Sequence, residues 1–131
     1  MFTNADVVSS YTRAQAIADG VLVDCSSLAR EAGFRVPLAM TAAAWHSSVA
    51  WTDANEDDKH MGQSEVGRLW DVLWMALQAA KRTEGDRVAF TVLRVPVEGE
   101  GLAAEPVELV LHIGPGDAGE PVCTIMEPGE D

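Results

Sequence analysis

Alternating oxygen-bearing side chains at Asp53, Asn55 and Asp57 are the first feature of this sequence that could do chemistry. A calcium loop begins with oxygen ligands at alternating positions, then needs Gly at its sixth residue and a bidentate Glu at its twelfth. Here those two positions hold Asp58 and Ser64. The residues that bend the loop and complete the coordination shell are missing, so we interpret the segment as a solvated acidic loop between two helices.

The histidines and cysteines form no recognisable metal-binding motif. His46, His60 and His112 are not paired with another His, Cys or Asp at ligand-like spacing, and Cys25 and Cys123 make no C-x-x-C. Zinc needs three or four such ligands at one point. We therefore expect no metal and no cofactor. For the cysteines we expect two buried free thiols, with a disulfide between them as the alternative.

Nucleophilic catalysis has no signature either. The pattern G-x-S-x-G is absent, and the glycine-rich residues 114–119 lack the Lys-Ser/Thr ending of a phosphate loop, so they predict a hairpin turn. Carboxylates such as Asp19, Asp24 and Asp71 could do acid–base work if burial held one of them protonated. The alternative function is therefore a small enzyme or ligand-binding domain with a carboxylate-lined cleft that uses Asp24, Asp71 or His112.

The four tryptophans fall into two pairs. Trp45 and Trp51 lie in one expected helix, and Trp70 and Trp74 lie four residues apart on one side of the next. Packing between helices is the ordinary role of such residues. The alternative is that Trp51 or Trp74 lies partly exposed beside the acidic residues 53–58. An aromatic anchor rimmed by acids suits a protein interface, because Trp is enriched among residues that dominate binding energy.

Charge is the most unusual property of the chain. Nine basic residues face 21 acidic ones, for a formal net charge of −12, and no Lys or Arg follows Arg94. Such a charge keeps a protein soluble and repels phosphate backbones and anionic membranes. We therefore expect neither direct nucleic-acid binding nor a membrane partner. A basic protein surface is the partner that this charge permits, and solubility alone is the alternative explanation.

The elements predict a single α+β domain over residues 1–131, with a helical part at about 10–83 and a β-meander at about 87–127. The strongest helix covers residues 65–82, where apolar residues recur at helical spacing (Val66, Leu69, Trp70, Leu73, Ala76, Leu77 and Ala80). A second helix is favoured from about Leu38 or Thr41 to Trp51, because this stretch is rich in alanine. Period-two patterns near residues 88–95, 107–113 and 122–126 predict three strands.

These strands, separated by short turns, predict an antiparallel meander of three to four strands packed against the long helix, with short helices in the N-terminal part. Residues 21–24 would supply the fourth, edge strand. The first residues show no basic and apolar regions of a signal peptide, and no apolar run is long enough to cross a bilayer. We therefore expect a cytoplasmic protein.

The segments 11–24, 67–75 and 119–131 resemble a family of small uncharacterised bacterial proteins, a domain of unknown function carried on plasmids, integrative elements and phages. The likeness extends nearly end to end. The family supplies no activity and no site residues. The resemblance implies that the protein is an accessory protein encoded by mobile DNA. Small acidic proteins of such elements often inhibit host defence systems.

From the charge and this resemblance we expect a non-catalytic interaction protein with an anti-defence role. Its acidic surface would occupy the basic groove of a host nucleic-acid-processing defence complex, in the place of phosphates. A homodimer through a strand edge or a tryptophan face is compatible with this function. The expected contact residues are two acidic groups and two tryptophans: Asp53, Glu56, Asp57, Asp58, Glu98, Glu100, Glu105, Glu108, Trp51 and Trp74.

Overall fold

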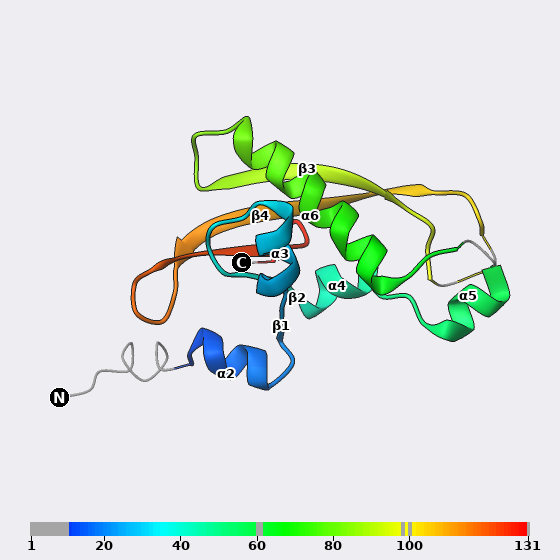
Figure 1. Ribbon diagram of the computed structural model, residues 1–131, viewed down its shortest axis with the longest axis horizontal. Helices are drawn as coiled ribbons and strands as arrows, with labels where there is room; N and C mark the ends of the chain where they lie inside the picture. The colour runs from blue at the N-terminus through cyan, green and yellow to red at the C-terminus, as the bar shows by residue number, and fades with distance from the viewer. Residues whose placement is uncertain (1–10, 60–61, 98, 100, 131) are drawn as a thin grey trace.

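A five-stranded mixed sheet organises the chain (Figure 1). The computed structural model describes residues 11–59, 62–97, 99 and 101–130, with the backbone alone at Asp58. The strands lie in the order β1-β2-β5-β4-β3. Their bounds are Leu22–Asp24 (β1), Leu38–Thr41 (β2), Arg87–Arg94 (β3), Glu105–Pro115 (β4) and Pro121–Met126 (β5).

The α+β class and the antiparallel β3–β4–β5 meander are confirmed. The prediction of an antiparallel sheet of three to four strands is wrong in the number of strands and in their direction. The sheet has five strands, because β2 inserts between β1 and β5, and β2 pairs with β5 in parallel. β2 was hidden in the alanine-rich segment expected to be helical. Leu38, Ala39 and Met40 are all buried, as suits a strand covered on both faces.

Thr41 marks where this strand becomes a helix. Its backbone is extended and its side chain accepts a hydrogen bond from the Ala44 N–H at 3.1 Å, which caps helix α4 (Ala42–Ser48). The alanine-rich stretch is therefore part strand and part helix, and the helix begins only after the cap.

Helix α6 (Glu65–Lys81) is the longest helix of the described residues, and it packs over β3. Ser64 caps it by accepting from the Gly67 N–H at 3.1 Å. Its buried face differs from the predicted one: Val66 and Trp70 are exposed, while Arg68 faces inward. The residues that do face the core are Arg68, Leu69, Val72, Leu73, Ala76 and Ala79.

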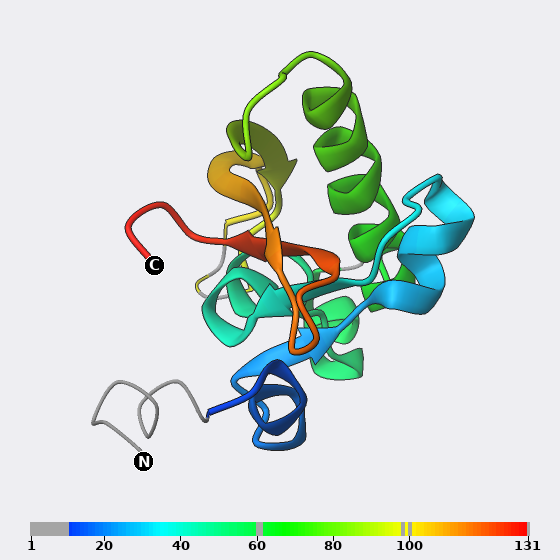
Figure 2. The ribbon, with the colours of Figure 1, turned by 90° about the vertical axis from the view of Figure 1, so that its left-hand side faces the viewer.

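The core lies between the sheet and two helices, α6 and α3 (Ser26–Ala32), which lie on the same side of it (Figure 2). Leu38 of β2, Leu73 of α6, Leu109 of β4 and Ile125 of β5 are fully buried there. One cluster thus joins residues from the helical part with residues from the strand-rich part. Helix α2 (Arg13–Ala18) lies beside β1.

Helix α5 (Asp53–Lys59) corrects the prediction of an exposed loop over residues 52–63. The Thr52 N–H donates to Asn55 Oδ1 at 2.8 Å, and the Asn55 N–H donates back to Thr52 Oγ1 at 3.1 Å. This reciprocal pair closes the first turn as a capping box does. Asp53 in the first turn and Lys59 in the last also suit the helix dipole.

None of the described helices is long and apolar enough to cross a membrane.

Candidate protein-interaction surface

Three of the nine basic side chains are buried within a protein that has a large excess of acids. Lys59 is 7% exposed, Arg68 is 2% exposed and Arg94 is 6% exposed. Buried cations usually face carboxylates, because an unpaired charge is costly in the interior. Here their hydrogen bonds go mainly to backbone carbonyl oxygens.

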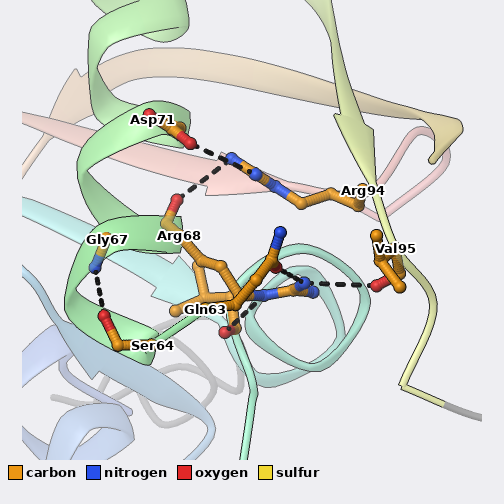
Figure 3. Close-up of polar contacts among 8 residues, drawn as sticks. Gln63, Ser64, Gly67, Arg68, Asp71, Arg94 and Val95 are labelled. Carbon is orange, nitrogen blue, oxygen red and sulfur yellow. Dashed lines mark hydrogen bonds and ion pairs between the residues drawn. The ribbon is translucent and has the colours of Figure 1, made fainter. Parts of the chain in front are cut away.

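Arg68 joins the start of α6 to three other segments (Figure 3). Its Nε donates to the Val49 carbonyl at 3.0 Å, and its Nη1 donates to Gln63 Oε1 at 2.8 Å and to the Val95 carbonyl at 3.2 Å. The guanidinium carbon lies 4.9 Å from the centroid of the Trp51 ring, within cation–π range. Burial, and secondly the charge of Arg94, lower the pKa of Arg68 to about 10.

Arg94, at the end of β3, lies beside Arg68 (Figure 3). Its Nη2 donates to the Arg68 carbonyl at 3.1 Å, and its Nη1 lies 3.5 Å from Asp71 Oδ2. The Asp71 side chain is 66% exposed, so solvent weakens this ion pair. Burial lowers the pKa of Arg94, although Asp71 acts in the opposite direction. Arg68 Nη2 and Arg94 Nε are buried without a hydrogen-bond partner among the described residues.

Lys59 binds the last turn of α5 to the connection between β3 and β4. Its Nζ donates to the Pro96 carbonyl at 2.5 Å and to the Gly101 carbonyl at 2.8 Å. Asn55 Nδ2 of the same helix donates to the Val97 carbonyl at 3.3 Å. α5 therefore lies against this connection at one end of the molecule (Figure 1).

This contact joins the two segments that carry the predicted acidic groups and that are far apart in the sequence. Asp53 and Asp57 are exposed on α5, and Glu105 is exposed where β4 begins. We call these three carboxylates the acidic end. Glu108 is also exposed, three residues further along β4. Three of the expected contact residues, Glu98, Glu100 and the side chain of Asp58, lie outside the described residues.

Glu56 has an internal role that its place in the acidic segment did not predict. Its Oε1 accepts from Trp51 Nε1 at 3.2 Å and from the Gln63 N–H at 2.9 Å, and its Oε2 accepts from the Gly62 N–H at 2.8 Å. The side chain is half-buried. Glu56 thus stabilises the turn before α6, and both of its carboxylate oxygens are engaged within the protein.

The tryptophans divide differently from the sequence-based expectation. Trp51 is 5% exposed, so it cannot be a surface anchor, and it packs against Arg68 instead. Trp74 is 49% exposed, and Trp70, which we expected in the core, is 39% exposed. The exposed indoles lie along the outer side of α6. Helical spacing placed the pair on one side, but nothing in the spacing showed that this side faces solvent.

Two hollows flank the first turn of α6. One has a volume of about 410 Å³ and is lined in part by Val66, Gly67, Trp70 and Asp71. The other has a volume of about 270 Å³ and includes Val66 with three acidic residues, Asp53, Glu56 and Glu65. Val66 belongs to both, so Asp53 of the acidic end and the exposed Trp70 line neighbouring hollows.

The residues of the alternative cleft do not come together. Asp71 lines the hollow beside Trp70, whereas Asp24 lines a separate hollow of about 190 Å³ with Arg13, Asp117 and Glu120. The carboxylates of that second hollow are exposed, as is Asp19, whose Oδ2 accepts from the Tyr11 hydroxyl at 3.0 Å. His112 lies on β4 and lines neither hollow.

The carboxylate of Asp24 and the two cysteines have structural roles. Hydrogen bonding by Ser26, through its hydroxyl and its backbone N–H, lowers the pKa of Asp24 at the start of α3. Cys25 and Cys123 are free and buried, as predicted. Burial raises the pKa of the Cys25 thiol to about 12 and also raises that of Cys123.

No group of three or more His, Cys, Asp or Glu among the described residues could hold a metal ion.

Fold and surface together define a small acidic α+β domain. The chain belongs to the family described as a family of unknown function (DUF6573), whose model matches residues 1–131. No curated protein and no solved structure matches it.

Proposed function

We propose that this protein is a non-catalytic interaction protein that binds a basic protein surface through its acidic end. The observation that carries this proposal is the use of Lys59, Arg68 and Arg94 as internal ligands for backbone carbonyls. Lys59 and Arg68 donate to carbonyl and amide oxygens, so these hydrogen bonds engage no carboxylate, whereas Arg94 also pairs with Asp71. Lys59 also holds α5 beside the β3–β4 connection, which concentrates Asp53, Asp57 and Glu105 at one end.

A concentrated negative field speeds association with a positive partner and suppresses binding to negative ones. We propose that the partner is a cytoplasmic host complex that processes nucleic acid in defence, and that the carboxylates occupy the groove where phosphates bind. The resemblance to proteins carried on plasmids, integrative elements and phages supports this choice of partner. Inhibition would follow from competition for the groove, without a covalent step.

Affinity capture from a bacterial lysate at low and high salt, followed by mass spectrometry, tests this function. The informative variant carries Asp53→Lys, Asp57→Lys and Glu105→Lys. The matched control carries Glu31→Lys, Glu84→Lys and Asp86→Lys, three exposed carboxylates away from the acidic end. Both variants change the net charge equally, so only the position of the charge differs.

We expect the protein to capture a nucleic-acid-binding protein at low salt and to release it at about 1 M salt. The control variant should capture the same partner. The acidic-end variant should lose it. If both variants captured the same proteins as the natural sequence, the acidic end would have no part in binding. Light scattering on the same samples shows whether the protein binds as a monomer or as a homodimer.

A further inference from the structure

Helix α6 carries a row of large apolar side chains on its solvent side. Val66 is 68% exposed, Trp70 is 39% exposed and Trp74 is 49% exposed. They lie four residues apart, so they are neighbours along one side of the helix. We call these three residues the α6 stripe. Single exposed apolar residues are common, but a contiguous row with two indoles is typical of an interaction site.

An acidic side chain lies within the α6 stripe. Asp71 precedes Trp74 by three residues, which makes these two side chains neighbours along the helix. Asp71 also lines the same hollow as Trp70. Its side chain is 66% exposed, and among the described residues only its Oδ2 is engaged, at 3.5 Å from Arg94. Its Oδ1 is available to a second cation.

Space for a side chain exists next to these groups. The hollow of about 410 Å³ is lined by Val66, Trp70 and Asp71. The rest of its lining is small or polar: Gly62, Gln63, Ser64, Gly67 and Arg68. The neighbouring hollow adds the carboxylates of Asp53 and Glu65. Val66 and Trp70 offer apolar contacts next to the carboxylate of Asp71. These groups match a side chain that has an aliphatic stem and a cationic end.

We propose that the α6 stripe binds a segment of the protein partner in which an arginine is flanked by apolar side chains. The arginine stem would lie over Trp70 and Trp74, and its guanidinium would pair with Asp71. Planar guanidinium groups stack on indoles and bind carboxylates better than ammonium groups do. The protein uses the same pairing internally, where Arg68 lies over Trp51. This inference rests on the proposed function only for the positive charge of the partner.

A second copy of the chain fits the α6 stripe less well. Two stripes in contact would bring together two Asp71 carboxylates and two chains of net charge −12. Like charges facing each other across an interface oppose association. A cationic segment meets the same apolar residues and neutralises the carboxylate.

The test uses a short synthetic amphipathic peptide with leucine and arginine on one face, and tryptophan fluorescence with calorimetry as readouts. Comparison peptides replace arginine with lysine, arginine with glutamate, or leucine with serine. The protein variants are Trp70→Ala, Trp74→Ala and Asp71→Asn, with Leu93→Ala as the matched control. Leu93 is 64% exposed on β3, so this variant also removes a large exposed apolar side chain. Thermal unfolding checks that every variant is folded.

We expect the arginine peptide to bind more tightly than the lysine and serine peptides, and the glutamate peptide not to bind. Trp70→Ala and Trp74→Ala should each weaken binding by about tenfold or more, Asp71→Asn should weaken it several-fold, and Leu93→Ala should leave it unchanged. Equal binding by Trp74→Ala and Leu93→Ala would overturn the proposal. So would a dimer in light scattering that Trp74→Ala converts to a monomer, because the stripe would then be a self-association surface.

The same peptides separate this inference from the proposed function. If the acidic-end variant loses the captured partner while Trp74→Ala retains both partner and peptide, the α6 stripe is not an anchor and the proposed function stands. If Trp74→Ala loses the arginine peptide while the acidic-end variant captures its partner normally, the α6 stripe binds cations independently of the acidic end.

Discussion

Arg94 donates a hydrogen bond from its Nη2 to the backbone carbonyl of Arg68 at 3.1 Å. The buried guanidinium of Arg94 is thus bound to the main chain of Arg68, whose own guanidinium is also buried. The Arg68 carbonyl belongs to α6, where the side chain of Arg68 itself extends to Val49 and Val95. The two arginines thus connect the long helix, the end of β3 and the segment after α4. This connection supports the end of the molecule where α5 and its carboxylates lie.

Replacing Arg68 with Ala should destabilise the protein strongly. The change removes the donors to the Val49 and Val95 carbonyls and the contact with Trp51, and it leaves buried acceptors without partners. We expect the free energy of unfolding in urea to fall by about 2–4 kcal/mol. Arg35→Ala, at an exposed position, should change it by less than about 0.5 kcal/mol. Similar small effects for both variants would show that the buried guanidinium has no structural role.

Replacing Lys59 with Met should loosen α5 from the β3–β4 connection. Met keeps most of the apolar stem but cannot donate to the Pro96 and Gly101 carbonyls. Hydrogen exchange of the α5 amides should accelerate by about tenfold, since one or two hydrogen bonds hold this contact. Lys81→Met, at an exposed position on α6, is the matched control and should leave α5 unchanged. Unaltered exchange in the Lys59 variant would contradict the role given to this lysine.

Cys25 and Cys123 should resist alkylation in the folded protein. Burial raises the pKa of both thiols, and at a pKa of about 12 Cys25 has only roughly one part in ten thousand as thiolate at pH 8. Iodoacetamide at pH 8 should therefore modify neither thiol in native protein and both in urea, as mass spectrometry would measure. Rapid labelling of folded protein would show that the β1–β2–β5 region opens readily.

Asp24→Asn should reduce the acid sensitivity of the fold. The hydrogen bonds from Ser26 lower the pKa of Asp24 in the folded state, so its stabilising effect is present above the unfolded-state pKa, near 4, and is lost as the pH falls through the lower folded-state value. Asn at this position should lower stability at pH 7 by less than about 1 kcal/mol and flatten its decline below about pH 4. Thermal melts from pH 7 to pH 3, with Asp86→Asn as control, measure this. A decline as steep in the Asp24 variant as in the natural sequence would show that another carboxyl group is responsible.

Local patterns predicted the long helix and the meander because both are encoded by residues close in the sequence. The spacing of Leu69, Val72, Leu73 and Ala76 marks α6, and the alternation around Leu109 and Leu111 marks β4. β2 could not be found in this way, since its parallel partner β5 lies far along the chain and its short apolar run leads directly into α4. α5 did have a local signal, the Thr52 and Asn55 caps, which the density of acidic residues obscured.

The candidate surface was partly accessible to sequence reasoning. The exposed carboxylates Asp53, Asp57 and Glu105 follow from charge alone, but the contact that joins their segments depends on Lys59 and carbonyls about 40 residues away. The burial of Arg68 had a sequence signal: this residue lies four positions before Val72, at the spacing of the apolar face. No sequence signal showed that Trp51 is buried and Trp70 exposed, because tryptophan is common both in cores and on binding surfaces.

The most direct test of the acidic end is the affinity for the captured partner measured by calorimetry across a series of salt concentrations, with and without competing DNA. We predict that affinity falls steeply with salt, that DNA competes, and that the variant with lysine at Asp53, Asp57 and Glu105 binds at least about tenfold more weakly than the control with lysine at Glu31, Glu84 and Asp86. Equal affinities for the two variants, or an affinity that is insensitive to salt and DNA, would contradict the account.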